Sequence, residues 1–416
     1  MTDIAPDILT TADGRPLKAA LASAQSRARR RAFFLVLPLL AFVVLTFVVP
    51  IFQMLHRSVY HDGFSAVAPQ LNAWFAANPE GSAITEAAYA ALVGDLVQMQ
   101  KDKTAGQAGT RVNYTLPGTI SVFKATAREA DRLVPPFKAA LTGLNKIWAD
   151  PNIWTSMRAA SNPYTADFYL IAVDLKRGPD GKFQRVAENT RIYRYLFVKT
   201  FVLSAVITGL CLMLAFPIAH LLAVLPMARS NLLMILVLLP FWTSLLVRTT
   251  SWMVLLQEQG VANNVMVAAG LLRDDGRIRM MYNQIGTIIV MTHILLPFMV
   301  LPLYSVMRTI PPAYARAARS LGATSWTTFR RIYLPQTLPG IAAGSLLVFI
   351  LAVGYYITPA LVGGADGQLI SNFISFHMNK SNWSLAAAIA AILLAAVLIL
   401  YWLYDRLIGI DKLKLG

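Results

Sequence analysis

The sequence predicts an all-α membrane protein with six transmembrane helices and a large, mainly helical extracytoplasmic insertion between helices 1 and 2. Of the 416 residues, 56% are hydrophobic and only 14% are charged, whereas soluble domains carry about 25% charged residues. Six apolar runs reach the roughly 20 residues that a bilayer-spanning helix needs. A long polar region separates the first run from the other five.

The amino-terminal segment predicts a cytoplasmic tail followed by a membrane helix. Residues 1–31 are polar and end in a cluster of arginines, and we expect a largely disordered tail on the cytoplasmic side. Residues 32–55 are apolar throughout. This run is too long for a signal peptide and lacks a small-residue cleavage site. It therefore predicts an uncleaved first transmembrane helix.

Residues 56–195 predict a small extracytoplasmic domain. Apolar residues recur at helical spacing in residues 84–100, 119–134 and 136–148. The stretch "FYLIAVDL", residues 168–175, reads as a strand that enters a turn at Asp180-Gly181. We therefore expect several helices and one β-hairpin.

Residues 196–410 predict the membrane core, and residues 411–416 a short cytoplasmic tail. The five further apolar runs cover residues 197–224, 231–255, 284–307, 337–360 and 384–407. Cytoplasmic termini place every basic short loop on the cytoplasmic side, as the positive-inside rule requires. The sequence does not decide the structure of two exterior segments. Residues 257–283 can form an interfacial element, and residues 361–383 can form a loop or a re-entrant element.

Several classes of function are excluded by what the sequence lacks. It contains no phosphate-binding loop, nucleophile elbow, H-E-x-x-H motif or Cys/His metal cluster. We therefore expect no enzyme, no metal and no cofactor bound by this chain. The net charge of +16 lies in clusters beside apolar runs, which indicates a lipid bilayer rather than nucleic acid as the partner.

Residues 311–335 predict two short helices joined by a tight turn. Pro311-Pro312 separates them from the preceding span, Gly322 suits a left-handed helix cap, and Thr324 or Ser325 can start the second helix. We expect that helix to end near Tyr333. Small residues on the first helix and an aromatic stripe on the second favour a docking element for a cytoplasmic protein. On charge alone, a loop that only fixes topology is an equal explanation.

This segment resembles the EAA loop of type I ATP-binding-cassette importer permeases. Their pattern is Glu-Ala-Ala, three residues, Gly, nine residues and Ile-x-Leu-Pro, and only Arg316 departs from it, standing where glutamate is usual. The resemblance implies the type I importer permease fold and coupling to a partner ATPase. The residues that it assigns to coupling are Arg316, Ala317, Ala318, Arg319, Gly322, Ala323, Phe329, Arg330, Ile332, Leu334 and Pro335.

Residues 240–256, 295–307 and 361–374 are similar to the spermidine/putrescine subgroup of these permeases. The resemblance implies a subunit that forms half of a pathway for a small organic cation such as putrescine or spermidine. It implies a second permease in a heterodimer, two ATPase subunits that bind ATP and Mg, and a periplasmic binding protein. It also implies a bacterial inner membrane, and in the related maltose importer a large loop contacts the binding protein, as residues 56–195 could here. An amino-acid derivative or opine as substrate, and an ion-coupled secondary transporter, are the alternatives.

Six residues are candidates for the substrate pathway or a gate: Trp242, Thr243, Arg248, His293, Tyr355 and Asp366. The last four also have simpler structural explanations. Arg248 can line the pathway or reach the interface, and His293 can be satisfied by a neighbouring helix. Tyr355 can belong to the interfacial aromatic belt or bind an ammonium group. Asp366 can attract a cation or be an ordinary loop charge.

Overall fold

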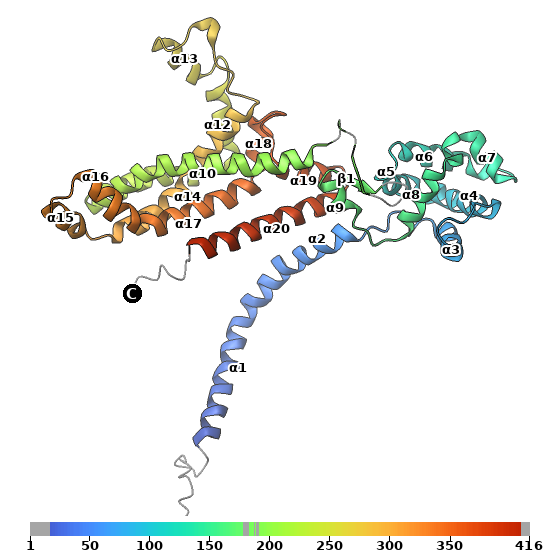
Figure 1. Cartoon of the computed structure of the whole chain (residues 1–416), viewed down its shortest axis with the longest axis horizontal. Coiled ribbons are helices and arrows are strands. Elements are labelled where there is room, and N and C mark those ends of the chain that lie inside the picture. The colour runs from blue at the N-terminus through green and yellow to red at the C-terminus, as the bar shows by residue number, and fades with distance from the viewer. Residues whose placement is uncertain (1–16, 178–182, 187, 189–190, 409–416) are drawn as a thin grey trace, which may run out of the picture. The chain divides into compact units, whose positions relative to one another are not determined.

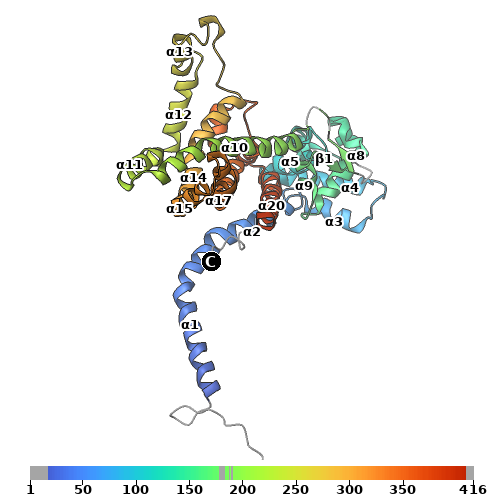
Figure 2. The ribbon, with the colours of Figure 1, turned by 60° about the vertical axis from the view of Figure 1, so that its left-hand side comes forward.

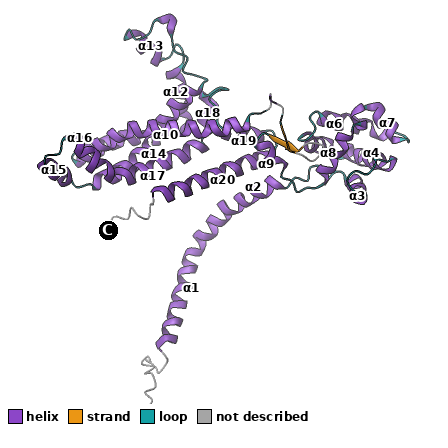
Figure 3. Cartoon of the chain, viewed as in Figure 1, coloured by secondary structure: helices purple, strands orange, loops and turns teal. Residues whose placement is uncertain are grey.

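A computed structural model describes residues 17–177, 183–186, 188 and 191–408. The chain divides into two compact units, one up to Arg57 and one from Ser58 onwards. Figures 1 and 2 show the elements in two views, and Figure 3 shows that helices dominate both units. The expected cytoplasmic tail 411–416 lies outside the described residues, as do residues 1–16.

The described part of the first unit is one long helix, whose last two residues belong to the second unit. It comprises α1 (Leu17–Val43), the π-helical turn η1 (Val44–Val48) and α2 (Val49–Val59). Residues Ala24–Val59 are long and apolar enough to cross a membrane. The expectation of a disordered tail is wrong from Leu17 onwards, because alanine and arginine are strong helix formers and extend the span.

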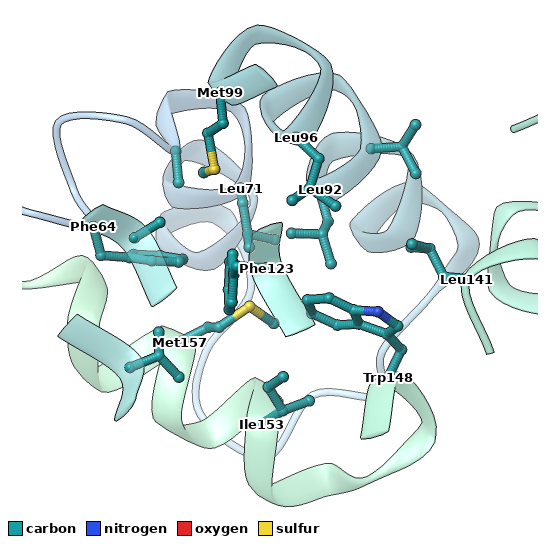
Figure 4. Packing of buried hydrophobic residues seen from close by; sticks show 14 of the residues in the cluster. Phe64, Leu71, Leu92, Leu96, Met99, Phe123, Leu141, Trp148, Ile153 and Met157 are labelled. Atoms are coloured by element: carbon teal, nitrogen blue, oxygen red, sulfur yellow. The ribbon is translucent and has the colours of Figure 1, made fainter. Parts of the chain in front are cut away.

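Residues 60–192 contain seven helices and a two-stranded hairpin among their described part. The helices are α3 (Pro69–Ala77), α4 (Glu86–Lys101), α5 (Ala105–Asn113), α6 (Thr119–Glu129), α7 (Phe137–Leu144), α8 (Pro151–Ser161) and α9 (Asp167–Ala172). Helices α4, α6 and α7 lie where apolar spacing predicted helix. Figure 4 shows their buried core around Phe123 and Trp148. The Trp148 indole donates to Thr126 Oγ1 at 3.1 Å, so the one polar atom of this side chain is satisfied.

The predicted strand at residues 168–175 is mostly wrong. Residues up to Ala172 are helical in α9, and only β1 (Leu175–Arg177) pairs, antiparallel, with β2 (Phe183–Arg185). The predicted turn at Asp180-Gly181 lies outside the described residues. Phe168 and Ala172 are four residues apart and are both buried in one cluster with Leu385 and Ile389. A short apolar run suits either a strand or a helix. Here the packing of Phe168 and Ala172 against Leu385 and Ile389 favours the helix.

Four long helices form the core of the second unit. They are α10 (Tyr193–Val224), α14 (Gln284–Thr309), α17 (Leu334–Gly354) and α20 (Trp383–Ile408), and each has the length and hydropathy of a membrane span. Helices α10, α14 and α17 share one buried cluster. Gly340 in α17 lies where a Cβ would stand 3.0 Å from the Pro302 carbonyl oxygen of α14, so glycine permits this close approach.

The predicted span at residues 231–255 is broken. Helix α11 (Met227–Leu238) and a 3₁₀ turn (Leu239–Trp242) are followed by α12 (Leu245–Leu256) and α13 (Val261–Ala268), with a bend of 97° at the break. Thr243 and Ser244 are extended, and the Ser244 hydroxyl accepts from Val247 N, which starts a new helix. The described residues therefore hold five continuous candidate spans, or six if the bent pair is one span.

Candidate functional site

Residues 311–335, here called the docking unit, begin with α15 (Pro312–Ser320). This helix ends at Gly322, whose φ of 85° lies in the left-handed region, as predicted. Gly322 N donates to Arg319 O at 2.9 Å and Ala323 N donates to Ala318 O at 3.0 Å. These two bonds satisfy the last carbonyls of the helix and turn the chain sharply.

The second half of the docking unit is continuous with a membrane span. Thr324 caps α16 (Ser325–Thr328) by accepting from Thr327 N at 3.2 Å, and a π-helical turn, η7 (Phe329–Tyr333), leads directly into α17. The expected helix end near Tyr333 is therefore wrong. Pro335 has no N–H to donate and its ring crowds the preceding turn. The wider π turn before Pro335 accommodates that ring, so the helix continues.

The aromatic stripe of the docking unit is anchored to α10. Trp326 stacks on Phe329 with ring centroids 5.7 Å apart, and Phe329 stacks on Tyr333 at 6.3 Å. Phe216 meets Phe329 edge to face, and the Tyr333 hydroxyl and His220 Nδ1 are 2.8 Å apart. The stripe therefore fixes the docking unit to the core at one end, while Trp326 is 67% exposed at the other.

A groove of about 650 Å³ separates the docking unit from the ends of α10 and α14. Its walls include Tyr314 from α15, Phe329 from η7 and Arg308 from α14. The Arg308 guanidinium donates to the Ala223 carbonyl at 2.8 Å and so holds the turn that follows α10. A helix pair with an adjoining apolar groove can receive a complementary surface of a partner protein.

The predicted coupling residues differ in exposure. Those in solvent are Arg316, Ala317, Arg319, Gly322, Arg330 and Pro335, and those half-buried are Ala318, Ala323, Phe329, Ile332 and Leu334. No residue of α15 is buried. Leu321, which the sequence reasoning missed, is 90% exposed at the tip of the turn. An apolar side chain directly before the capping glycine was the signal that could have found it.

Three of the candidate pathway residues come together from three helices. The charge of Arg248 in α12 acts on both His293 in α14 and Tyr355 at the end of α17. Trp252 donates its indole N–H to His293 Nδ1 at 2.9 Å, so a neighbouring helix does satisfy this histidine. The Arg248 Nε atom is buried and has no hydrogen-bond partner among the described residues.

The structure does not bring the other three candidates to this cluster by any hydrogen bond or ring contact among the described residues. Trp242, 77% exposed, and Thr243 lie at the break before α12. Asp366 lies in a glycine-rich turn between α18 (Ile357–Val362) and α19 (Ile370–Asn379). Its backbone carbonyl accepts from the ammonium group of Lys199, while the residue itself is exposed.

Lys199 was missed by the sequence reasoning, although a lysine within the apolar run of α10 was visible. It is buried, and with Thr287, which donates to the Gly367 carbonyl at 3.1 Å, it fixes the turn. Thr200 of α10 also accepts from Ile370 N at 2.8 Å. Residues 363–369 are therefore an ordered element. Within the described part of the chain, no group of three or more His, Cys, Asp or Glu side chains is placed to hold a metal ion.

The docking unit links α14 and α17, two helices with the length and hydropathy of membrane spans. Residues 192–408 match the family described as binding-protein-dependent transport system inner membrane component. The chain belongs to this family, whose members are permease subunits rather than enzymes. This confirms the resemblance to ATP-binding-cassette importer permeases and the type I permease fold.

Among curated relatives, the chain is similar to the spermidine/putrescine transport system permease protein PotB of Escherichia coli (strain K12). The two are 37% identical over 222 residues, which cover 52% of this chain and 80% of PotB. It is also 31% identical to the inner membrane ABC transporter permease protein YdcU of the same organism, over 52% of this chain and 73% of YdcU. A solved bacterial ABC transporter involved in the import of the acidic polysaccharide alginate superposes with a TM-score of 0.46 at 19% identity. That match covers 71% of this chain and 100% of the other.

Proposed function

We propose that this chain forms half of the translocation pathway of an ATP-driven importer for a small organic cation such as putrescine or spermidine. The identity of 37% to PotB over 222 residues supports the substrate class. The docking unit supports the energy source, because it offers a partner an exposed helix pair beside a groove of about 650 Å³. No phosphate-binding loop occurs in this sequence, so the partner supplies ATP and Mg binding.

The proposed assembly contains this chain, a second and different permease, two ATPase subunits and a periplasmic binding protein. The binding protein contacts residues 56–195, and both termini of this chain lie in the cytoplasm of a bacterium. The charge pattern of the short loops supports this orientation. The helical region around α4, with its own buried core between Phe64 and Ala160, supports a binding surface in this region.

The continuous helix from α16 through η7 into α17 suggests how ATP binding reaches the pathway. Residues Ser325–Gly354 form one helix of 30 residues. When the ATPase subunits close, they move the docking unit, and the span moves with it because no loop interrupts the helix. The two nucleotide states then favour two orientations of the spans through different contacts with the docking unit.

Uptake by the reconstituted complex, carried out with Gly322→Pro, tests this proposal. Proline fixes φ near −65° and cannot adopt the φ of 85° at this turn. We expect ATP-dependent putrescine uptake to fall about tenfold or more, since such strain is of order 1–3 kcal/mol. Gly354→Ala is the matched control, because a Cβ at Gly354 meets no atom within 4 Å. Normal uptake by Gly322→Pro would exclude the coupling role.

The substrate and energy alternatives are separate arms of the same experiment. If an opine or an amino-acid derivative displaces labelled putrescine and binds more strongly than putrescine, that compound is the substrate. Uptake in liposomes that hold this chain and an ion gradient, but no ATPase, would support an ion-coupled transporter.

A further inference from the structure

A pocket of about 440 Å³ is lined by residues from the amino-terminal end of α10 and from the β1–β2 hairpin. Figure 1 shows where β1 lies in the fold. We call it the arginine pocket. Its lining residues are Asp174, Arg185, Arg191, Arg194, Tyr195 and Val198. The permease function gives this pocket no role, since it lies far along the chain from the docking unit and touches none of the candidate pathway residues.

Asp174 builds the pocket, and backbone N–H groups occupy the acceptor sites of its carboxylate. Its carboxylate accepts from the backbone N–H groups of Ile192 and Tyr193, each at 3.1 Å, and of Arg194 at 2.8 Å. Its carbonyl accepts from Val186 N at 3.2 Å, next to Arg185. One residue therefore caps α10 and holds the hairpin against it, which brings the three arginines to one place.

The three arginines keep most of their donors for a ligand. Arg185 and Arg194 are exposed, and among the described residues their guanidinium groups have no hydrogen bond or ion pair. Arg191 donates only its Nε–H, to the Val186 carbonyl at 2.6 Å, which orients the guanidinium and leaves its terminal nitrogens available. Three arginines and one aspartate line the pocket, so its net charge is positive and favours an anion. The planar donor forks of the guanidinium groups suit phosphate oxygens.

The other wall of the pocket is apolar and continues along α10. The side chains of Tyr195, Val198, Val202 and Val206 are 62%, 63%, 53% and 43% exposed. Their spacing of three and four residues places them in one stripe on the helix. The ammonium group of Lys199 lies 5.5 Å from the centroid of the Tyr195 ring, on the protein side of this stripe.

The length of α10 places the pocket at the level of lipid headgroups. The helix has 32 residues, or about 48 Å, whereas the hydrocarbon core of a bilayer is about 30 Å thick. Its first turns therefore extend into the headgroup region, and the valine stripe runs from there into the hydrocarbon. A free phosphate would use the arginines alone, whereas a phospholipid would use both walls.

We propose that the arginine pocket binds the headgroup phosphate of an anionic glycerophospholipid whose acyl chain lies along Val198, Val202 and Val206. The site fixes the start of α10 and the adjoining hairpin to the membrane surface. This role is independent of the transported substrate.

Native mass spectrometry of the full chain, released from detergent with added lipid, tests the proposal. The probes are phosphatidylglycerol and phosphatidylcholine with identical acyl chains. We expect the parent to prefer phosphatidylglycerol and Arg185→Gln/Arg194→Gln to lose about 30-fold of that preference, because each arginine near an anionic surface contributes about fivefold. The matched control is Arg128→Gln/Arg273→Gln, which removes the same charge from two other exposed arginines whose guanidinium groups have no hydrogen bond or ion pair among the described residues.

Glycerol 3-phosphate distinguishes a lipid from a free phosphate ester. Failure of millimolar glycerol 3-phosphate to displace phosphatidylglycerol supports the lipid site, whereas full displacement would overturn it. An unchanged lipid preference in Arg185→Gln/Arg194→Gln would also overturn it. A third outcome would overturn it as well. If the unmodified protein forms a dimer, the double variant does not, and neither prefers phosphatidylglycerol, then a second copy of the chain covers the pocket.

Discussion

Arg316 occupies the position where this chain departs from the glutamate of its relatives' pattern. It is exposed on α15, and its guanidinium group makes no hydrogen bond or ion pair with the described residues; its backbone carbonyl additionally accepts from Ser320 Oγ. The side chain therefore contributes little to the fold and is available to a partner. We therefore predict that the proposed partner ATPase carries an acidic group opposite Arg316.

Reversal of this charge is predicted to weaken the complex without unfolding the chain. We expect Arg316→Glu to lower affinity for the partner ATPase roughly 30-fold, because a like-charge contact of about 2 kcal/mol replaces an attractive one. The unfolding midpoint should stay unchanged. Pull-down titration measures the affinity, and Arg128→Glu, far from the docking unit, is the control. Tighter binding by Arg316→Glu would show that the partner is basic at this contact.

Asp95 in α4 predicts a pH dependence in the helical region between α2 and α10. Burial raises the pKa of its carboxyl from 3.8 to about 6, although Gln70 N and Leu71 N both donate to it and oppose the rise. Because this folded-state pKa exceeds the unfolded value, the folded state binds more protons. The free energy of unfolding should therefore fall as pH rises from about 4 to about 6, and be constant above that range.

Hydrogen exchange of the full chain, followed in peptides from α3 and α4 between pH 4 and 7, measures this dependence after correction for intrinsic exchange. Asp95→Asn should remove the slope, and Asp131→Asn, an exposed carboxyl, should retain it. A parent protein whose protection increases with pH in this window would contradict the prediction.

Single residues show what the sequence could and could not predict about the site. The role of Gly322 as a left-handed cap followed from local spacing, since only residues within one turn decide it. The convergence of Arg248, His293 and Tyr355 could not follow, because it depends on how three helices rotate against one another. The bond from Lys199 to the Asp366 carbonyl joins residues 167 positions apart, which no local pattern encodes.

Elements of the fold were predictable where a strong local signal determined them. The long apolar runs at α10, α14, α17 and α20 allowed one structure only. The break before α12 was not predicted, because Pro240 also suits a kinked continuous span and the extended Ser244 gives no hydropathy signal. The π turn η7 was missed for the same reason, since hydropathy does not distinguish one helical hydrogen-bond pattern from another.

The glycine-rich turn at residues 363–369 leaves little room for a side chain. A Cβ at Gly367 would overlap the backbone of Gly363 and the hydroxyl of Thr287. We expect Gly367→Ala to destabilise the chain by about 1–3 kcal/mol or more, as overpacking does. Gly354→Ala should be neutral or stabilising, because that glycine is helical and its Cβ position is open.

Thermal unfolding in detergent compares these two variants. A lower midpoint for Gly367→Ala alone is the expected result. Equal midpoints would show that the turn accommodates the added methyl group without loss of stability. The bonds of Lys199 and Thr287 to the turn would then contribute nothing to the stability of the chain.

Within the second unit, α9 joins the helical region around α4 to the membrane core. Phe168 of α9 is fully buried, lies 5.6 Å from the Arg111 guanidinium, and packs in one cluster with Leu385 and Ile389 of α20. A change in this side chain therefore affects both regions. The sequence could not show this, because it placed Phe168 in a strand of a separate extracytoplasmic domain.

Phe168→Ala should destabilise both regions by about 3–5 kcal/mol in total. Hydrogen exchange should quicken in α4 and in α20 together. Phe123→Ala is the matched control, since in the described part of the chain Phe123 belongs to the buried cluster of the first of these regions, beside Phe64 and Trp148. Protection of α20 that is unchanged in Phe168→Ala would show that the two regions unfold independently.

The uninterrupted helix Ser325–Gly354 also has a kinematic consequence. Thirty residues at 1.5 Å per residue make a lever arm of about 45 Å. A tilt of about 5° at the docking end, with the helix pivoting at its opposite end, displaces the docking end by about 4 Å. A displacement of this size at the docking end therefore corresponds to a small change in the tilt of the helix within the bilayer. Such a change needs little rearrangement of the surrounding lipid.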